Sequence, residues 1–174
     1  MKKIIETERI ILRKAEKLDA KDLLPYIQEE KIKEFVSLPN ELNKLSEYIE
    51  ESENNKKTYR RVIVLKENKK IIGSIILRNI IKMHQKVEIG YRIGNAHEGK
   101  GYITESLNGI NKYIFLKTEF QRIGARIRVD NEATIHNVEK LGFVKEGRAR
   151  NYNKKGSISY DLFLFSLLKE DYLK

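Results

Sequence analysis

The residues with the clearest chemical potential lie in the stretch HEGKGYITES, residues 97–106. Gly99 and Gly101 flank Lys100 directly before a run whose apolar spacing predicts a helix from Tyr102 onward. The first turn of a helix presents unpaired backbone N–H groups and a partial positive charge, so it attracts anions. Glycines also let a ligand approach the main chain without a Cβ in the way. The stretch therefore predicts a phosphate site, although an ordinary tight turn explains a Gly-x-Gly pair equally well.

Two widespread phosphate-binding motifs do not fit this stretch. Residues 94–101, GNAHEGKG, come within one residue of the pattern G-x-x-x-x-G-K-[ST], but Gly101 stands where Ser or Thr would hold magnesium. The dinucleotide pattern G-x-G-x-x-G fails as well, because Thr104 occupies the position of its third glycine. A phosphate bound here would be held by main-chain amides at a helix start, without a metal.

The composition argues against several other kinds of site. The absence of cysteine excludes a disulfide framework, a thiolate metal site and a covalent cysteine mechanism. His84, His97 and His136 show no metal-ligand spacing, so we expect no metal. Charges interrupt the isoleucines of the first 14 residues, and no run approaches the ~20 apolar residues of a membrane span. These features fit a cytoplasmic protein without membrane contact.

The formal net charge of +10 is unevenly distributed along the chain. Residues 1–57 hold 12 Lys and Arg against 13 Asp and Glu, whereas residues 58–174 hold 23 against 12. The positive part carries the glycine turn, which favours an anionic cofactor, substrate or nucleic acid. Carboxylates in the acidic-leaning residues 19–57 would attract a cationic amine, or they form solvated helix faces.

The apolar patterning predicts one α/β domain that spans residues 1–174, with a core from about 8 to 170. The order β-α-α-β-β-β-α-β-α-β-β favours a mixed central sheet with helices on both faces. Strands are predicted at 8–15, 59–65, 71–81, 86–93, 124–129, 143–152 and 157–168, and helices at 19–27, 40–53, 102–117 and 132–141.

Local signals indicate how these elements begin and end. Asp19 is a candidate N-terminal cap of the first helix, and Gly142 a candidate C-terminal cap of the last. The three strands within 59–93 are separated by the short polar turns ENKK and KMHQ, which predicts an antiparallel meander. In the helix at 102–117, one face is predicted to be apolar, with Ile103, Leu107, Ile110, Ile114 and Phe115.

Four segments around the glycine turn resemble the GNAT family of acetyl-CoA-dependent N-acetyltransferases. They are EIGYRI (88–93), GKGYITESL (99–107), VDNEATIHNVEKLGF (129–143) and EGRARN (146–151). The resemblance is strongest to the ribosomal-protein Nα-acetyltransferases RimJ and RimL, and it extends from ETERIILRKAEKLDA to SLLKEDYL. It implies an enzyme that moves the acetyl group of acetyl-CoA to a primary amine.

The resemblance also implies a set of cofactor-binding positions. The backbone N–H groups of the glycine turn would cradle the pyrophosphate, and backbone groups at the end of the preceding strand would pair with the pantetheine arm. Asn131 is implied to contact that arm, although an N-terminal cap is the common use of Asn at such a position. The implied residues are Tyr91, Arg92, Ile93, Gly99, Lys100, Gly101, Tyr102, Ile103, Thr104, Asn131 and Asn137.

The catalytic residues implied by the family are less well matched. A cysteine-free chain favours direct attack of the amine on the thioester. Val138 stands where many relatives have a tyrosine acid, so Thr134 is the implied hydrogen-bond donor to sulfur, unless it bonds to its own helix turn. Glu88 is a candidate base. Alternation along the strand places it on one face with Arg92, so a structural ion pair competes with the catalytic role. Tyr152 is a candidate for the acceptor pocket.

The amine acceptor stays open at this point. A protein N-terminus, which the RimJ and RimL branch suggests, competes with a small amine such as a polyamine or an aminoglycoside-like antibiotic. A different class of function, a basic nucleic-acid-binding module, would use the positive C-terminal part. Against it, Arg122, Arg126 and Arg128 alternate within one strand, and no recognition helix is evident. Contact with the ribosome and formation of a homodimer are further expectations from the resemblance.

Overall fold

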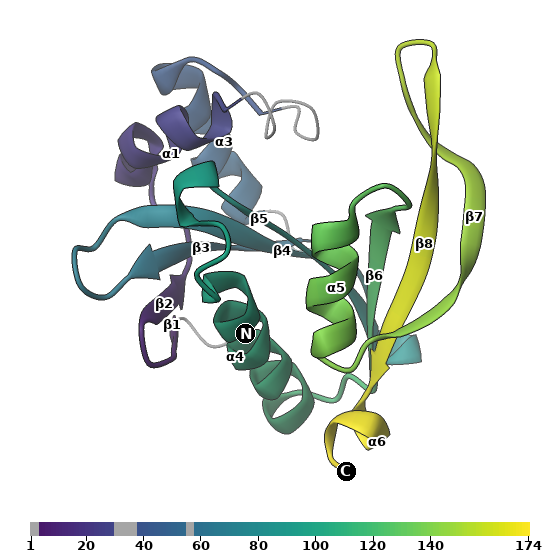
Figure 1. Ribbon diagram of the computed structural model, residues 1–174. Helices are drawn as coiled ribbons and strands as arrows, with labels where there is room; N and C mark the ends of the chain where they lie inside the picture. Colours follow the sequence, from purple (N-terminus) through teal and green to yellow (C-terminus); the bar gives the residue numbers. More distant parts are fainter. Residues whose placement is uncertain (1–3, 30–37, 55–57) are drawn as a thin grey trace. The chain divides into compact units, whose positions relative to one another are not determined.

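The computed structural model describes residues 4–29, 38–54 and 58–174, which form two compact units (Figure 1). Unit 1 comprises Met1–Arg78 and Tyr91–Ile110, and unit 2 comprises Asn79–Gly90 and Asn111–Lys174. Strands β4 (Ile71–Ile81) and β5 (Lys86–Ile93) and helix α4 (Tyr102–Lys117) therefore contribute residues to both units.

Unit 1 is built on an antiparallel run of strands in the order β1-β2-β3-β4. The strand predicted over 8–15 contains β2 (Ile10–Arg13), whereas β1 (Ile4–Glu6), which pairs with β2 in a hairpin, was not predicted. The turn is closed by Thr7, whose backbone N–H donates to the carbonyl of Ile10 at 3.0 Å. The Thr7 hydroxyl bonds to the same residue at 3.2 Å, a contact that apolar alternation does not predict.

Two helices, α1 (Ala20–Ile27) and α3 (Leu42–Asn54), cover one face of β3 (Tyr59–Leu65). Because successive side chains of a strand point to opposite faces, the core under these helices contains Val62 and Val64, while Ile63 and Leu65 point away from it. Both faces are nevertheless buried, so β3 lies deep in unit 1. The helix residues in this core are Leu23, Tyr26, Ile27, Leu45 and Ile49.

The predicted capping role of Asp19 for the first helix is wrong. Asp19 closes a short 3-10 helix, Lys17–Asp19, and its carboxylate accepts a hydrogen bond from the N–H of Glu16 at 2.7 Å. The same carboxylate accepts two hydrogen bonds from Arg13, at 2.6 and 2.8 Å. Since both oxygens are used by the preceding turn and by β2, the carboxylate does not cap α1.

Unit 2 has a mixed sheet in the order β5-β6-β8-β7. The first residues of β5 pair in parallel with β6 (Arg122–Arg128), which pairs antiparallel with β8 (Ile158–Leu168). The edge strand β7 (Val144–Lys155) completes the antiparallel hairpin with β8 that is visible as the long arm of Figure 1. The predicted terminal hairpin is thus confirmed, with Gly156 at φ 59° in its turn.

The helix that follows the glycine turn and the helix before β7 have the predicted ends. α4 spans Tyr102–Lys117, and all five predicted core residues on it are at most 7 % exposed. α5 (Glu132–Lys140) is followed by Gly142, whose φ of 85° is accessible to glycine and strained for other residues. The N–H groups of Gly142 and Phe143 bond back to Glu139 and Val138, which satisfies the last carbonyls of the helix.

The chain ends in a short helix, α6 (Lys169–Tyr172), that the sequence patterning did not predict. Tyr172 packs its ring 5.2 Å from that of Phe115, so the terminus is attached to the core of unit 2. Within the residues that the structure describes, no helix is long and apolar enough to cross a membrane.

Candidate active site

The glycine turn of unit 1 has a backbone conformation that requires glycine. Gly99 and Gly101 have φ values of 71° and 77°, in the left-handed region that other residues rarely adopt. A Cβ at Gly99 would meet no atom within 4 Å, and one at Gly101 would meet only Arg9 Nη2, at 3.5 Å. The glycines are therefore needed for the path of the main chain, and the space beside them is open.

This turn exposes a continuous row of backbone donors. In the part of the chain that the structure describes, the N–H groups of residues 99–104 donate to no protein acceptor. The first paired donor is the N–H of Glu105, which bonds to the carbonyl of Gly101 at 3.0 Å and opens the ladder of α4. Six consecutive unpaired amides at the positive end of a long helix have the donors that a phosphate or diphosphate requires. This donor set fits the pyrophosphate of coenzyme A.

A clamp that involves Arg9 holds the turn in place. Arg9 Nε donates to Glu105 Oε2 at 2.6 Å, and Arg9 Nη1 donates to the carbonyl of Lys100 at 3.1 Å. The guanidinium also lies 4.7 Å from the ring centre of Tyr102. The other carboxylate oxygen of Glu105 accepts from the Thr7 hydroxyl at 2.6 Å and from the N–H of Arg9 at 2.7 Å. The hairpin β1–β2 thereby fixes both the loop and the first turn of α4.

Sequence reasoning missed this clamp. Arg9 and Glu105 are 96 residues apart, and no local spacing connects them. Burial raises the pKa of Glu105, but the hydrogen bonds from Thr7 and Arg9 outweigh it, and the pKa is lower than that of an ordinary glutamate. A carboxyl with a depressed folded-state pKa stabilises the fold above its unfolded pKa, and this contribution is lost as pH falls through the folded value. The clamp is therefore complete at neutral pH.

Glu105→Gln is expected to weaken coenzyme A binding about tenfold, because the loop loses the charged acceptor that holds Arg9. The amide keeps the size of the side chain, so circular dichroism should show a folded protein. Calorimetric titration with coenzyme A measures the change. Glu132→Gln is the matched control, since Glu132 is an exposed glutamate in the first turn of α5. Equal affinities of wild type and Glu105→Gln for coenzyme A would show that the clamp does not determine the conformation of the loop.

Two side chains of the loop, Lys100 and His97, make contacts within the loop and the start of α4. The Lys100 ammonium donates to the carbonyl of Ala96 at 2.9 Å, so it bonds within the loop itself. His97 is half-buried, and its ring centre lies 6.3 Å from that of Tyr102. Burial lowers the pKa of His97, and the charge of Lys100 lowers it further. A neutral imidazole at pH 7 adds no charge for a phosphate.

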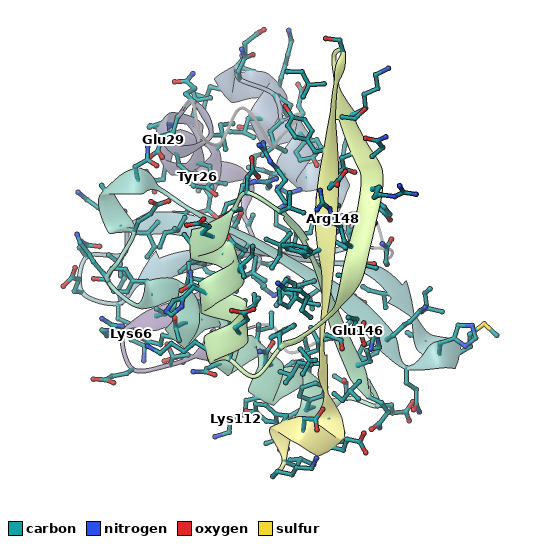
Figure 2. All side chains as sticks on the ribbon, turned by 45° about the vertical axis from the view of Figure 1, so that its right-hand side comes forward. Tyr26, Glu29, Lys66, Lys112, Glu146 and Arg148 are labelled. Carbon is teal, nitrogen blue, oxygen red and sulfur yellow. The ribbon has the colours of Figure 1, made fainter. Side chains whose placement is uncertain are left out.

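The start of the loop is held by the residues that follow α1. Glu29 Oε2 accepts a hydrogen bond from the N–H of Asn95 at 3.0 Å. A Cβ on Gly94 would approach Glu29 Oε1 at 3.1 Å and Tyr26 Cδ2 at 3.5 Å. Figure 2 shows Tyr26 and Glu29 near each other at this end of α1. The hydrogen bond between Glu29 and Asn95 that holds the loop also joins residues that are far apart in the sequence.

The end of β5 is packed closely against β4 within unit 1. A Cβ at Gly73 would lie 2.3 Å from the carbonyl oxygen of Arg92, so only glycine permits this approach. The N–H of Gly94 donates to the carbonyl of Ile72 at 2.9 Å. Burial lowers the pKa of Arg92, and the positive charges of Arg60 and Arg78 lower it further, against the opposing effect of Tyr26. The positive charges of Arg60 and Arg78 thus act on the guanidinium group of Arg92 within unit 1.

In unit 2, the structure brings Glu88 and Tyr152 together through Arg126. Glu88 forms the kind of ion pair that competes with a catalytic role, and its partner is Arg126, whose Nη2 lies 2.5 Å from Glu88 Oε2. Arg126 Nη1 also donates to the Tyr152 hydroxyl. Glu88 is opposite Gly124 in the parallel ladder, which places Arg126 on the neighbouring strand within reach. The carboxylate of Glu88 is thus engaged in an ion pair, which competes with a role as the catalytic base.

Asn131 and Thr134 meet at the start of α5. Asn131 Oδ1 accepts from the N–H of Thr134 at 3.1 Å and caps the helix. The neighbouring carboxylate of Asp130 accepts a hydrogen bond from Arg128 Nε at 2.9 Å. Within the described residues, the Thr134 hydroxyl does not bond to its own helix turn, in contrast to that of Thr118, which donates to a carbonyl of α4 at 2.5 Å. The side-chain amide nitrogen of Asn131 takes no part in this capping hydrogen bond.

The arginines of β6 do not form a bare cationic stripe. Each of the three has a carboxylate partner in unit 2, so their charge is locally compensated, which argues against a phosphate-backbone surface along this strand. The pairs are Arg122–Glu146, Arg126–Glu88 and Arg128–Asp130. In the described parts of the chain, no group of three or more His, Asp or Glu side chains is placed to hold a metal ion.

Comparison with known proteins gives this geometry a family. Residues 9–144 match the family described as "Acetyltransferase (GNAT) domain". A crystal structure described as the acetyltransferase (GNAT family) from Bacillus anthracis superposes with a TM-score of 0.85. That comparison covers 96% of this chain and 99% of the other at 21% identity, and it shows a common fold.

Three curated relatives are similar in sequence. An uncharacterized N-acetyltransferase, p20, of Bacillus licheniformis is 30% identical and is matched over 95% of this chain and 96% of its own length. The spermidine N(1)-acetyltransferase of Vibrio cholerae is 32% identical over 51% of each chain. The ribosomal-protein-serine acetyltransferase of Escherichia coli is 27% identical over 51% of this chain and 50% of its own. The chain therefore belongs to the GNAT family and is an N-acetyltransferase with the α/β fold of that family.

Proposed function

We propose that this enzyme binds acetyl-CoA through the backbone amides of residues 99–104 and transfers the acetyl group directly to a primary amine. The observation that carries the proposal is the row of six unpaired N–H groups at the start of α4. Such amides satisfy the oxygens of a diphosphate without a metal. The proposed single domain comprises residues 1–174, with its core at about 8–170.

The residues of the chain have distinct parts in the proposed reaction. Bound acetyl-CoA supplies an acetyl group activated as a thioester. Main-chain groups of residues 91–93 pair with its pantetheine arm, and the Asn131 amide adds a contact. The Thr134 hydroxyl donates a hydrogen bond to the departing sulfur, since it makes no bond to its own helix turn. Without cysteine, no acyl intermediate forms on a thiol of the chain.

Proton removal from the amine does not depend on Glu88 in this proposal. Its carboxylate is paired with Arg126, and we assign the Arg126–Tyr152 pair a positioning role. An N-terminal amine has a pKa of about 7.7–8.0, so a large fraction is neutral at slightly alkaline pH. Water then carries the proton away after attack.

The leading acceptor is the N-terminal amine of a protein, which is consistent with similarity to a ribosomal-protein-serine acetyltransferase. A small amine is the second candidate, and similarity to a spermidine N(1)-acetyltransferase favours it. Because acceptor pockets vary within a fold, the family alone does not select between them.

The test is an amine screen in which release of the free thiol of coenzyme A is followed and products are identified by mass spectrometry. We expect thiol release to equal N-acetylated amine. A parallel titration with duplex DNA and RNA at low salt examines the nucleic-acid alternative, which requires affinity that falls steeply with salt. Binding of nucleic acid without thiol release from any amine would contradict the proposed function.

A further inference from the structure

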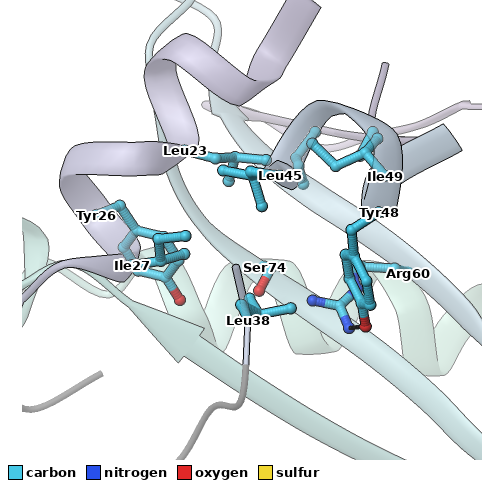
Figure 3. Close-up of a pocket in the computed structure, with 11 residues that line it drawn as sticks. Leu23, Tyr26, Ile27, Leu38, Leu45, Tyr48, Ile49, Arg60 and Ser74 are labelled. Carbon is cyan, nitrogen blue, oxygen red and sulfur yellow. Dashed lines mark hydrogen bonds between the residues drawn. The ribbon is translucent and has the colours of Figure 1, made fainter. Parts of the chain in front are cut away.

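Unit 1 contains a small cavity beneath α1 and α3 (Figure 3). Its walls are mainly core side chains such as Leu23, Leu45 and Ile49. Arg60 completes them, and its Nη2 donates to the Tyr48 hydroxyl at 3.3 Å. The volume of about 20 Å³ is enough for one water molecule, so a substrate group has no room there.

Two carboxylates of the acidic-leaning residues 19–57 form ion pairs on the surface of unit 1. Glu50 pairs with Lys17 at 3.0 Å and Glu41 pairs with Lys44 at 2.8 Å, and all four side chains are well exposed. Both carboxylates are solvated surface groups, as one of the two sequence interpretations held. Residues 30–37 and 55–57 lie outside the described part of the chain.

The glycine turn differs from both of these places, because its open side is reached by a side chain from elsewhere in unit 1. Arg9 lies between β1 and β2, and its Nη2 is 3.5 Å from the position that a Cβ on Gly101 would occupy. A Cβ lies about 2.5 Å from the nitrogen of its own residue, so Nη2 is within about 6 Å of the backbone nitrogen of Gly101. Two oxygens of one phosphate are about 2.5 Å apart and each accepts a hydrogen bond at about 2.9 Å, so one phosphate can bridge both donors.

The other donors of Arg9 are already used. Nε donates to Glu105 Oε2 and Nη1 donates to the carbonyl of Lys100, while the guanidinium lies over the ring of Tyr102. In the part of the chain that the structure describes, Nη2 donates to no protein acceptor. The side chain is 45 % exposed, so a ligand can reach the N–H groups of Nη2.

The charge of a diphosphate calls for a side-chain cation at this place. The diphosphate of coenzyme A carries about two negative charges, whereas a helix start supplies about half a positive charge. Within the loop, the ammonium of Lys100 bonds to the carbonyl of Ala96. A guanidinium beside the amides would add a charge-assisted hydrogen bond as well as charge.

We propose that Arg9 is a direct ligand of the diphosphate of coenzyme A. Its Nη2 donates to an oxygen of the phosphate that the N–H of Gly101 also holds. This inference rests on the proposed function, to which it adds a binding residue from a separate hairpin. It assigns Arg9 to the diphosphate and not to the 3′-phosphate, because Nη2 lies beside one of the amides that receive the diphosphate.

The clamp makes Arg9 a well-prepared ligand. A free arginine side chain loses rotamer freedom when it binds an anion, and this loss weakens binding. Glu105, the carbonyl of Lys100 and the ring of Tyr102 already hold the guanidinium in one orientation. The carboxylate of Glu105 offsets part of the positive charge, and in return it fixes the donor that the phosphate meets.

The experiment separates the direct contact from the clamp by calorimetric titration of coenzyme A into four proteins: wild type, Arg9→Gln, Glu105→Gln and the double variant. If Arg9 acts only through Glu105, both single variants break the same contact and lose the same affinity, about tenfold. With a direct contact, Arg9→Gln should bind about a hundredfold more weakly than wild type. The double variant should then bind about tenfold more weakly than Glu105→Gln, which still has the guanidinium.

The choice of ligand identifies the phosphate that Arg9 meets. Dephospho-coenzyme A, which lacks the 3′-phosphate, should show the same loss in Arg9→Gln as coenzyme A does. In ³¹P NMR spectra of the saturated complexes, Arg9→Gln should change the shift of a diphosphate resonance and leave that of the 3′-phosphate in place.

Two further variants serve as controls. Lys21→Gln removes one positive charge from an exposed position of α1 and should bind coenzyme A like wild type. Arg9→Lys keeps the charge but has one nitrogen instead of three, so it should bind about tenfold more weakly than wild type. Circular dichroism checks that each variant is folded, and if Arg9→Gln is not, Arg9→Lys provides the test, with wild-type affinity as the contradicting result.

The outcomes separate this inference from the proposed function. Equal losses in Arg9→Gln and Glu105→Gln, or a double variant no weaker than Glu105→Gln, would overturn the inference and leave the binding of acetyl-CoA in place. A loss that disappears with dephospho-coenzyme A would move Arg9 to the 3′-phosphate and overturn it as well. Failure of the wild-type protein to bind coenzyme A would overturn both.

Discussion

The double variant Gly99→Val, Gly101→Val is expected to bind coenzyme A more than about a hundredfold more weakly than wild type while it remains folded. Both glycines have positive φ, and a β-branched residue at such a position costs about 1–2 kcal/mol or forces the backbone into another conformation. Either outcome removes the alignment of the amides of residues 99–104. The branched side chains also occupy the open space that the diphosphate requires.

The fold should tolerate the change because the loop lies at the surface. A Cβ at Gly99 meets nothing within 4 Å, and one at Gly101 meets only the end of the Arg9 side chain. The buried residues of α4 begin at Ile103 and are not displaced by a strained turn before them. Thermal unfolding should therefore show a loss of a few degrees, while calorimetric titration with coenzyme A shows little or no heat.

The hairpin turn of unit 2 offers a matched control for backbone strain. Gly156 has φ 59°, and a Cβ there also meets nothing within 4 Å, so Gly156→Val carries the same kind of penalty as Gly99→Val. The two single variants should lose similar stability, but only Gly99→Val should lose affinity for coenzyme A. Retained affinity in the Gly99→Val, Gly101→Val protein would refute the assignment of the loop.

The elements that the sequence predicted best have a single strong periodicity. The bounds of β3, β4 and β5 and the span of α4 agree with the predicted ranges, because uninterrupted apolar runs and clear turn residues delimit them. Strand β1 was not predicted because the short turn that separates it from β2 lacks glycine and proline. Asp19 was misassigned because Arg13, on a separate strand, competes for the carboxylate.

The candidate site shows the same division between local and long-range information. Glycine conformation and helix starts are local properties, so the sequence located the amides of the loop. The supports of that loop are contacts between distant residues, such as Arg9 with Glu105 and Glu29 with Asn95. Likewise, the partner of Glu88 is set by the neighbour of β5 in the sheet, which the order of strands along the chain does not reveal.

Thr134→Val is expected to lower kcat about a hundredfold with KM for acetyl-CoA unchanged, because the departing sulfur loses its hydrogen-bond donor. Valine has nearly the shape of threonine, and the cap of α5 uses the backbone N–H of residue 134, which the change keeps. Thr134→Ser retains the hydroxyl and should retain most of the rate. Thr118→Val removes a hydroxyl that bonds to the last turn of α4, and it is the control for a general effect on stability.

Tyr152, predicted from the sequence to lie in the acceptor pocket, carries a second hydroxyl of unit 2, and Tyr152→Phe tests whether it replaces Thr134 as the donor to sulfur. Its hydroxyl is bound by Arg126 and its side chain is 47 % exposed, so water reaches it. Tyr152→Phe is therefore expected to change kcat less than Thr134→Val does. A large loss in Tyr152→Phe together with a normal rate in Thr134→Val would transfer the donor role to the tyrosine.

The pH dependence adds a second distinction between the two donors. In wild type, kcat/KM should rise as pH increases through the pKa of the acceptor amine, about 7.7–8.0 for an N-terminus, since only the neutral amine attacks. The Thr134 hydroxyl does not titrate in this range, so Thr134→Val should lower the whole profile by a constant factor without moving its midpoint. A midpoint that moves in this variant would mean that residue 134 affects the proton of the amine, and the donor to sulfur would have to be another group.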